Sequence, residues 1–394
     1  MYRIKLADNT IEKVELERLC EWILSGAQLT KGPLTLEFES AFADILGGGF
    51  ATLVNSGSSA NLLALFALDL ESTVKRRVAI APAISWVTTV TPAMQFGYDV
   101  HLCDCDHRTL GLDTDHFEHL CKKFKPSVAF FVDVLGHPNR MTEIRGIADK
   151  YEVKLVEDAC EAFGSRARNQ SLGTFGDVGT FSFYFGHQIS TIEGGAVWVR
   201  DRRLSNIVRS LRAHGWARDI DADIKASWES EFEIDEFRSL YTFYLPGYNF
   251  RSTDLGAFLG LSQLKKADLI ATRRQENFER YRMGLEDRYW VQKSESDLLS
   301  SFAFGTVVRN RLDVYRHLKA CGIESRPLIC GNIGRQPFWI KKYGETRLPN
   351  ADIIHDCGMY LPNHIGLTPA EIDEVTSEFR KVAIPHPSFG HRSH

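Results

Sequence analysis

Short apolar runs alternate with amphipathic stretches as far as residue 199, and this alternation limits the chain to few folds. The runs are apolar at consecutive positions, which is typical of strands covered on both faces. Six strands are predicted, at residues 78–81, 100–103, 128–132, 155–157, 179–183 and 196–199. Helices are predicted between them, including 59–70, 115–124 and 142–150. Such alternation indicates an α/β domain with a mostly parallel central sheet.

The pattern changes after about residue 205, where it becomes helical and more polar. Residues 265–285 predict one long charged helix, and the chain from about residue 299 mixes short strands with helices. We therefore expect two domains. Residues 1–255 would form an N-terminal segment and a large α/β domain, and residues 256–394 a smaller C-terminal α+β domain.

Charge and cysteine spacing exclude several classes of protein. The formal net charge is −4, so the basic surface of a nucleic-acid-binding protein is not expected. No apolar run approaches the roughly 18 residues of a membrane span, and the N-terminus lacks a signal-peptide apolar region. The eight cysteines include no CxxC pair. We expect a reduced, cytoplasmic protein with no nucleic-acid partner, no membrane partner and no metal site.

Four polar or aromatic clusters are candidates for a binding site. Residues 55–61, Asn-Ser-Gly-Ser-Ser-Ala-Asn, precede a predicted helix, so their N–H groups and hydroxyls could bind a phosphate. The same residues are also typical of an ordinary serine-capped helix. Trp86 follows the strand at 78–81 and could stack on a flat ring, although most tryptophans belong to cores.

The third and fourth clusters lie later in the predicted sheet. Asp158 follows the strand at 155–157, at the edge where α/β sheets bind ligands. A buried carboxylate there needs a cationic partner such as a pyridinium nitrogen, and a helix-capping aspartate is the alternative. Residues 173–195 predict a strand, a glycine-rich turn and a second strand, which is the most specific motif in the chain.

Together these clusters resemble the DegT/DnrJ/EryC1/StrS sugar aminotransferases, which are pyridoxal phosphate (PLP) enzymes of fold type I, the aspartate aminotransferase-like fold. The resemblance covers nearly the whole chain, and includes residues 30–33, 38–43, 56–61, 211–216, 245–251 and 324–327. Those aminotransferases carry a lysine that binds PLP covalently where this chain has His187. Residues 155–224 contain eight arginines and no lysine. Histidine cannot make that covalent link, but it transfers protons near neutral pH.

The resemblance implies a role for each candidate residue. His187 would be the catalytic base, with PLP or its amino form PMP held non-covalently. Gly57, Ser58 and Ser182 would hold the phosphate, Trp86 would stack on the ring, Asp158 would pair with the ring nitrogen and Glu161 would contact the ring. Asn249 would reach the phosphate of a partner subunit, which implies a homodimer with shared active sites. His214 and Arg218 would bind glutamate or the sugar, although ordinary packing roles remain open for both.

The histidine points to the dehydratases of this family. They use L-glutamate to remove the C3 hydroxyl of a nucleotide-linked 4-keto-6-deoxy sugar, releasing ammonia and a 3,6-dideoxy-4-keto sugar. The expected substrate is GDP-4-keto-6-deoxy-D-mannose, in colitose synthesis for the lipopolysaccharide O-antigen. Gly186 and Gln188 depart from the serine and histidine that flank the catalytic histidine in such enzymes, so substrate contacts stay open.

Three alternatives remain. A nucleotide-sugar aminotransferase is disfavoured by the missing lysine, and a catalytically dead PLP-binding regulatory protein is disfavoured by the intact motif around His187. A related dehydratase group carries an iron–sulfur cluster on four cysteines, with a Cys-x-Cys pair downstream of the histidine. No cysteine lies between Cys160 and Cys321, so we expect no iron–sulfur cluster.

Overall fold

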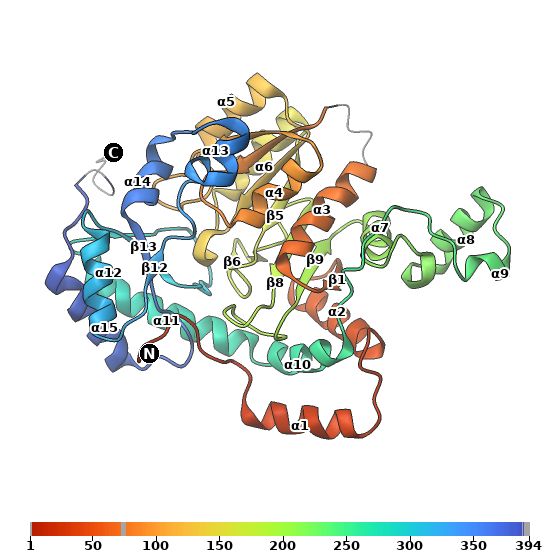
Figure 1. Cartoon of the computed structure of the whole chain (residues 1–394), viewed down its shortest axis with the longest axis horizontal. Coiled ribbons are helices and arrows are strands. Elements are labelled where there is room, and N and C mark those ends of the chain that lie inside the picture. The colour runs from red at the N-terminus through yellow and green to blue at the C-terminus, as the bar shows by residue number, and fades with distance from the viewer. Residues whose placement is uncertain (1, 72–75, 388, 390–394) are drawn as a thin grey trace.

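The computed structural model describes residues 2–71, 76–387 and 389. A seven-stranded sheet forms the centre of the larger part (Figure 1), in the order β1-β9-β8-β5-β4-β2-β3. Its strands are β1 (Phe50–Val54), β2 (Val78–Pro82), β3 (Asp99–Cys103), β4 (Val128–Val132), β5 (Lys154–Asp158), β8 (Val178–Ser182) and β9 (Gly195–Val199). Strand β9 runs antiparallel to both β1 and β8, whereas the other neighbours are parallel. The expected α/β class with a mostly parallel sheet is confirmed.

All six predicted strands are present, within about one residue of the expected bounds. The prediction missed β1, the edge strand that pairs with β9. Its sequence, Phe-Ala-Thr-Leu-Val, follows three glycines and is only five residues long. The other strands of the sheet are equally short, but β1 precedes all of them along the chain, so no strand–helix alternation leads up to it.

Helices cover both faces of the sheet. One face packs against α3 (Gly57–Glu71), α4 (Val87–Gln95) and α7 (Arg202–Arg212). The other packs against α2 (Pro33–Ile45), α5 (Thr114–Phe124), α6 (Met141–Tyr151) and α10 (Asp254–Leu264). This three-layer arrangement buries every residue of β4, β8 and β9 and explains their continuous apolar sequences.

The C-terminal part has its own antiparallel sheet and core. The sheet order is β10-β11-β13-β12, with strands Trp290–Val291, Phe304–Val307, Gly358–Leu361 and Arg326–Pro327 in that order. Its helices are α11 (Ala267–Leu285), α12 (Arg311–Ala320), α13 (Pro337–Tyr343), α14 (Pro349–Cys357) and α15 (Pro369–Val382). The helix predicted from residue 265 begins two residues later. The predicted boundary after residue 255 falls inside α10, which packs against α2, and the division into two domains stays a prediction.

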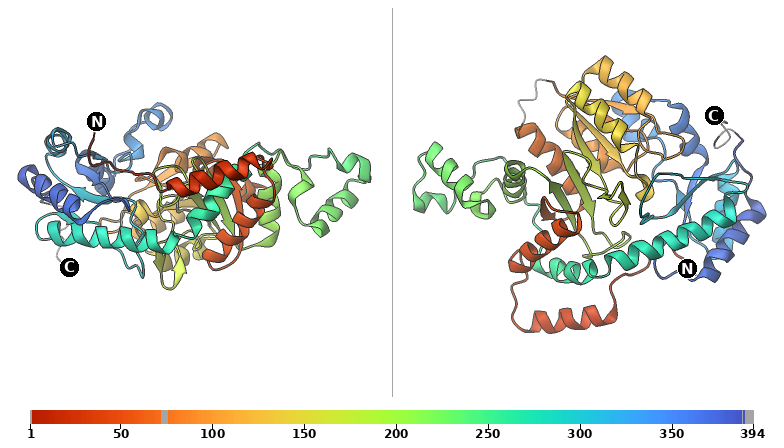
Figure 2. Two further views of the ribbon diagram at one scale, coloured as in Figure 1. Left: turned by 90° about the horizontal axis from the view of Figure 1, so that it is seen from below. Right: turned by 180° about the vertical axis from the view of Figure 1, so that it is seen from behind.

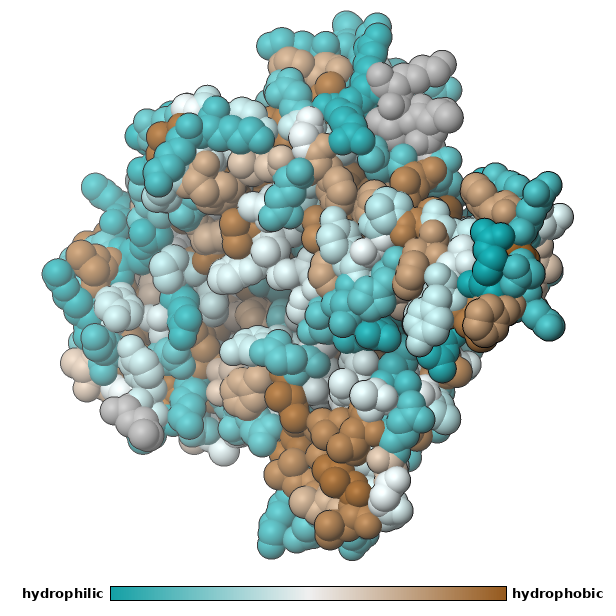
Figure 3. Space-filling model, turned by 45° about the vertical axis from the view of Figure 1, so that its right-hand side comes forward, coloured by the Kyte–Doolittle hydropathy of each residue, from teal (hydrophilic) through white to brown (hydrophobic). Residues whose placement is uncertain are grey.

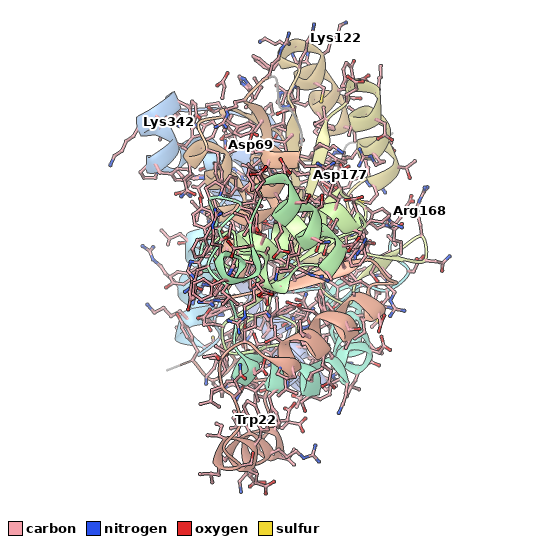
Figure 4. The ribbon with its side chains drawn as sticks, turned by 90° about the vertical axis from the view of Figure 1, so that its right-hand side faces the viewer. Trp22, Asp69, Lys122, Arg168, Asp177 and Lys342 are labelled. Carbon is pink, nitrogen blue, oxygen red and sulfur yellow. The ribbon has the colours of Figure 1, made fainter. Side chains whose placement is uncertain are left out.

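Three helices project from this body (Figures 1 and 2): α1 (Lys13–Leu24), α8 (Ala222–Glu231) and α9 (Glu236–Ser239). Trp22 lies at the outer end of the molecule in Figure 4 and stacks on Phe258 of α10, with 5.1 Å between ring centroids. Shorter elements are β6 (Arg166–Ala167), β7 (Gln170–Ser171) and the 3-10 turns Val134–Gly136, Ala217–Asp219 and Ile333–Arg335. Across residues 2–71, 76–387 and 389, no helix has the length and apolarity that a membrane crossing requires.

Candidate active site

Asp158 lies at the carboxyl end of β5, near the middle of the sheet, and is 4% exposed. Its carboxylate accepts hydrogen bonds from Asn61 Nδ2 at 2.8 Å, from Thr89 Oγ1 at 2.8 Å and from the Cys160 N–H at 3.1 Å. Thr180 donates to Asn61 Oδ1 at 2.6 Å, which fixes the amide orientation. All these partners are neutral, and no ion pair reaches Asp158 within the described residues. A buried carboxylate of this kind fits a cationic ring nitrogen.

The first turn of α3 lies beside this carboxylate. The N–H groups of Gly57 and Ser58 are at the start of the helix, where an α-helix supplies no acceptors of its own. A Cβ atom on Gly57 would lie 2.7 Å from Ser182 Cβ and 2.8 Å from Cys160 Sγ, so only glycine lets these segments meet. Ser58 Oγ is 2.9 Å from Thr88 Oγ1, which adds hydroxyl groups to the same place. This arrangement fits a phosphate.

His187 lies in the turn between β8 and β9, where its backbone N–H donates to the Tyr184 carbonyl at 2.9 Å. The half-buried ring packs against Phe302, with 5.3 Å between centroids, and its Nδ1 has no hydrogen-bond partner in the described chain. Burial, reinforced by the charge of Arg274, lowers the pKa of His187 to about 4, although a hydrogen bond to the Cys160 backbone acts in the opposite sense. The imidazole is therefore neutral at physiological pH and able to accept a proton.

A side-chain contact joins the His187 turn to the turn that follows Asp158, residues 159–164. The buried Gln188 side chain donates to the Glu161 carbonyl and to the Ser300 carbonyl. Glu161 in turn accepts from the Leu135 N–H at 2.8 Å, and burial raises the pKa of its carboxyl to about 8, with the charge of Asp158 adding to the effect. Gln188 thus has a structural role in this fold. Gly186 has room for a Cβ atom, whose nearest neighbour would be Ala7 Cβ at an ordinary contact distance of 3.7 Å.

Trp86 is the N-cap residue of α4 and is 59% exposed, so it is not a core tryptophan. It follows β2 and precedes Thr88 and Thr89, which contact Ser58 and Asp158. Its ring is therefore accessible, and it lies close in the chain to the residues that contact Ser58 and Asp158. Stacking of Trp86 on a ligand ring stays a prediction.

Asn249 and Arg218 line a separate groove together with Lys31, Trp216 and Arg251. None of Gly57, Asp158, Ser182 and His187 lines it. Arg251 donates to Asn249 Oδ1 at 3.0 Å, and its Nη2 lies 3.4 Å from His214 Nε2. The predicted site residues thus form two groups, one around Asp158 and His187 and one around this groove.

Sequence reasoning missed several of these residues. Asn61 lies within the 55–61 cluster and Thr89 follows the Trp86 cluster, but neither was assigned to Asp158. Arg274 of α11 was missed because nothing in a helix sequence indicates a buried cation that contacts a turn 87 residues away.

Comparison with known proteins agrees with this geometry. The model of the DegT/DnrJ/EryC1/StrS aminotransferase family matches residues 10–380. The chain belongs to this family. Its structure is also similar to that of the E. coli GDP-4-keto-6-deoxy-D-mannose-3-dehydratase with bound hydrated PLP, with a TM-score of 0.87, 30% identity and coverage of 96% of this chain and 100% of that one.

Two further relatives within the family are informative. The GDP-4-keto-6-deoxy-D-mannose 3-dehydratase of Escherichia coli O55:H7 is 31% identical over 376 residues, covering 92% of this chain and 96% of the relative. A GDP-4-keto-6-deoxymannose-3-dehydratase structure with a trapped PLP-glutamate geminal diamine has a TM-score of 0.85 and 30% identity, and covers 96% of this chain and 100% of that one. The expected family and the fold type I architecture are confirmed.

Proposed function

We propose that this protein is a PLP-dependent nucleotide-sugar 3-dehydratase that uses L-glutamate. One observation carries the proposal: His187 lies beside the Asp158 turn, where aminotransferases of this family carry their lysine. The segments that form the site, 55–61, 83–89 and 155–194, contain no lysine at all. A neutral imidazole supports proton transfer without a covalent link to the cofactor.

The residues present fit PLP and its amino form PMP, held non-covalently. Asp158 would pair with the ring nitrogen, Trp86 would cover a ring face and Glu161 would contact the ring edge. Gly57, Ser58 and Ser182 would bind the phosphate at the start of α3. When bound, the cofactor supplies an electron-accepting ring and carries the amino group that glutamate provides. No iron–sulfur cluster is part of the proposal.

His187 moves protons in the proposed reaction. Its neutral imidazole would accept a proton from the PMP carbon that bears the amino group. The resulting imidazolium would donate a proton to the C3 hydroxyl oxygen of the sugar, which leaves as water. The electrons for this reduction come from glutamate, which is oxidised to 2-oxoglutarate, and its nitrogen is released as ammonia. The sugar product is a 3,6-dideoxy-4-keto sugar.

We assign the groove around Asn249 to substrate recognition. Arg218 packs its guanidinium over the Trp216 ring at 5.4 Å, and Arg218 and Arg251 form no ion pair with a carboxylate of the described chain. Unpaired cations are suited to anionic groups such as a diphosphate or a carboxylate. His214 and Arg218 would bind the sugar nucleotide or glutamate. By likeness to the relatives we propose GDP-4-keto-6-deoxy-D-mannose as substrate, and colitose synthesis for lipopolysaccharide O-antigen as the pathway.

We also propose a homodimer with shared active sites. The His187 turn exposes Tyr184, Phe185 and Ile192 by 51%, 41% and 49%, and further exposed apolar side chains include Leu24, Leu29 and Leu36. Figure 3 shows apolar side chains gathered on the lower part of one face, towards α1. A second copy would cover such a surface and could bring its Asn249 to the phosphate.

All eight cysteines are free, which suits a cytoplasmic enzyme.

Product analysis tests the proposal. The protein is incubated with PLP, L-glutamate and GDP-4-keto-6-deoxy-D-mannose. The sugar products are identified by mass spectrometry, and ammonia is assayed separately. A 3-deoxy sugar with an equal amount of ammonia is expected. An amino sugar without ammonia would indicate an aminotransferase. No glutamate-driven change in the PLP spectrum would indicate a cofactor-binding protein without activity.

A further inference from the structure

A histidine, a cysteine and a glutamate meet on the outer side of the C-terminal part, where α12 packs against α15. His317 and Cys321 are four residues apart, so both side chains lie on the same side of α12 and its C-cap. Glu378 faces them from α15. The described residues contain one group of this kind. We propose that these side chains bind one zinc-type divalent ion, a site separate from the proposed dehydratase centre.

The distances between the ligand atoms carry the proposal. Cys321 Sγ lies 3.7 Å from His317 Nε2 and 3.6 Å from Glu378 Oε2. A tetrahedral zinc ion, with bonds of about 2.3 Å to sulfur and about 2.0–2.1 Å to nitrogen or oxygen, separates such ligand atoms by about 3.3–3.6 Å. The two sulfur distances are therefore close to those of a metal site. His317 Nε2 and Glu378 Oε2 are hydrogen bonded at 2.8 Å and must separate by about 0.5 Å to admit the ion.

The surroundings allow that movement and orient the glutamate. The side chains of His317 and Glu378 are 30% and 19% exposed, so an ion can enter from solvent and a water molecule can complete the coordination. Lys381 is 2.5 Å from the other glutamate oxygen, Oε1, and leaves Oε2 for the ion. The imidazole is a neutral ligand, and the thiolate and the carboxylate together supply two negative charges to the divalent ion.

The donor set determines which metal is expected. Calcium and magnesium require oxygen ligands, whereas one nitrogen, one sulfur and one oxygen are typical of zinc and cobalt sites. The ion would link α12 to α15 beside the N-terminal segment, since the Arg3 N–H donates to the Gly322 carbonyl at 2.8 Å and Arg3 pairs with Glu374 of α15. We therefore expect a stabilising site. No metal was expected from the sequence because the cysteines lack CxxC spacing, and here the glutamate lies 57 residues after the cysteine.

Cobalt titration of the chelator-treated full-length protein tests the site. One Co²⁺ per chain is expected, with the near-ultraviolet charge-transfer band of a cobalt–thiolate bond, and Zn²⁺ should displace it. Cys321→Ser should remove the band. Cys20→Ser, which changes the exposed thiol of α1, should keep it. Zn²⁺ should raise the Tm of the wild type and of Cys20→Ser but not of Cys321→Ser.

A second variant tests the site even if Cys321→Ser does not fold. Glu378→Gln keeps the thiol, so the band should persist while the cobalt affinity falls by at least about 10-fold. Absence of the band at equimolar Co²⁺, or its survival in folded Cys321→Ser, would overturn the proposal. Unchanged cobalt affinity in Glu378→Gln would overturn it as well.

Discussion

The guanidinium of Arg274 donates to the backbone carbonyl of His187 at 3.5 Å, and among the described residues no carboxylate balances its charge. A second nitrogen of the group, Nη1, donates to the carbonyls of Ser301, Phe302 and Asn363 at 3.2, 2.9 and 2.5 Å. Burial lowers the pKa of Arg274 to about 10. A buried cation therefore holds three chain segments around the histidine and helps to keep its imidazole neutral.

Replacing Arg274 should change the titration of His187. Arg274→Met removes the charge, so the pKa of His187 should rise from about 4 towards its usual range. Arg274→Lys keeps a cation and should leave the pKa low. Both variants should be less stable, by about 1–3 kcal/mol for each carbonyl left without a donor. NMR titration of the His187 ring provides the measurement, and equal pKa values in wild type and Arg274→Met would contradict this account.

The same pKa sets the acidic limit of the proposed activity. The base must be neutral, and a histidine with a pKa of about 4 is almost fully neutral above about pH 5. The single-turnover dehydration rate, corrected for unfolding at each pH, should thus stay level from about pH 8 to about pH 5. It should fall as the pH drops through about 4. A loss of rate centred near pH 6.5 would show that His187 titrates with an ordinary pKa.

His187→Asn should remove the proton transfer and leave the site otherwise intact. We expect the dehydration rate to fall by about 10²–10⁴-fold, the usual contribution of a positioned acid–base group. Cofactor affinity and Tm should stay close to the wild type. Gly186→Ser is the matched control in the same turn, because its new Cβ would be 3.7 Å from the nearest atom and activity should persist. Turnover of His187→Asn within about tenfold of wild type would exclude the histidine as the base.

Glu161 should make stability depend on pH. Burial raises the pKa of its carboxyl from 4.5 to about 8, so the folded state favours the protonated form. The contribution of this group to stability is fully present below about pH 4.5 and is lost as the pH rises through about 8. Glu161→Gln, which can still accept from the Leu135 N–H, should be increasingly more stable than wild type from pH 5 to pH 9 in urea unfolding. Glu21→Gln, at an exposed position of α1, is the control. Parallel pH curves for wild type and Glu161→Gln would refute the assignment.

The sequence predicted the sheet and the position of Asp158 better than it predicted the residues that hydrogen-bond to the site. The five inner strands and the edge strand β3 were found from their short apolar sequences, whereas the other edge strand, β1, was missed. The order of residues along the chain was enough to place Asp158 at the end of a strand. Its partners Asn61 and Thr89 come from α3 and α4, and only the folded arrangement shows that both side chains reach the same carboxylate. The structural role of Gln188 was likewise invisible, because its acceptors are backbone carbonyls of distant segments.

Two glycines in helices should respond to alanine in opposite ways. Gly57 opens α3, and a Cβ there would lie 2.7 Å from Ser182 Cβ and 2.8 Å from Cys160 Sγ, so Gly57→Ala must displace the segments proposed to hold the phosphate. Gly146 lies inside α6, where an added Cβ would have no atom within 4 Å, so Gly146→Ala should gain up to about 1 kcal/mol from helix propensity. We expect Gly57→Ala to lose stability by about 1–3 kcal/mol from overpacking and to bind PLP more weakly, as measured by urea unfolding and equilibrium dialysis. Unchanged PLP affinity in a folded Gly57→Ala variant would show that the start of α3 does not bind the phosphate.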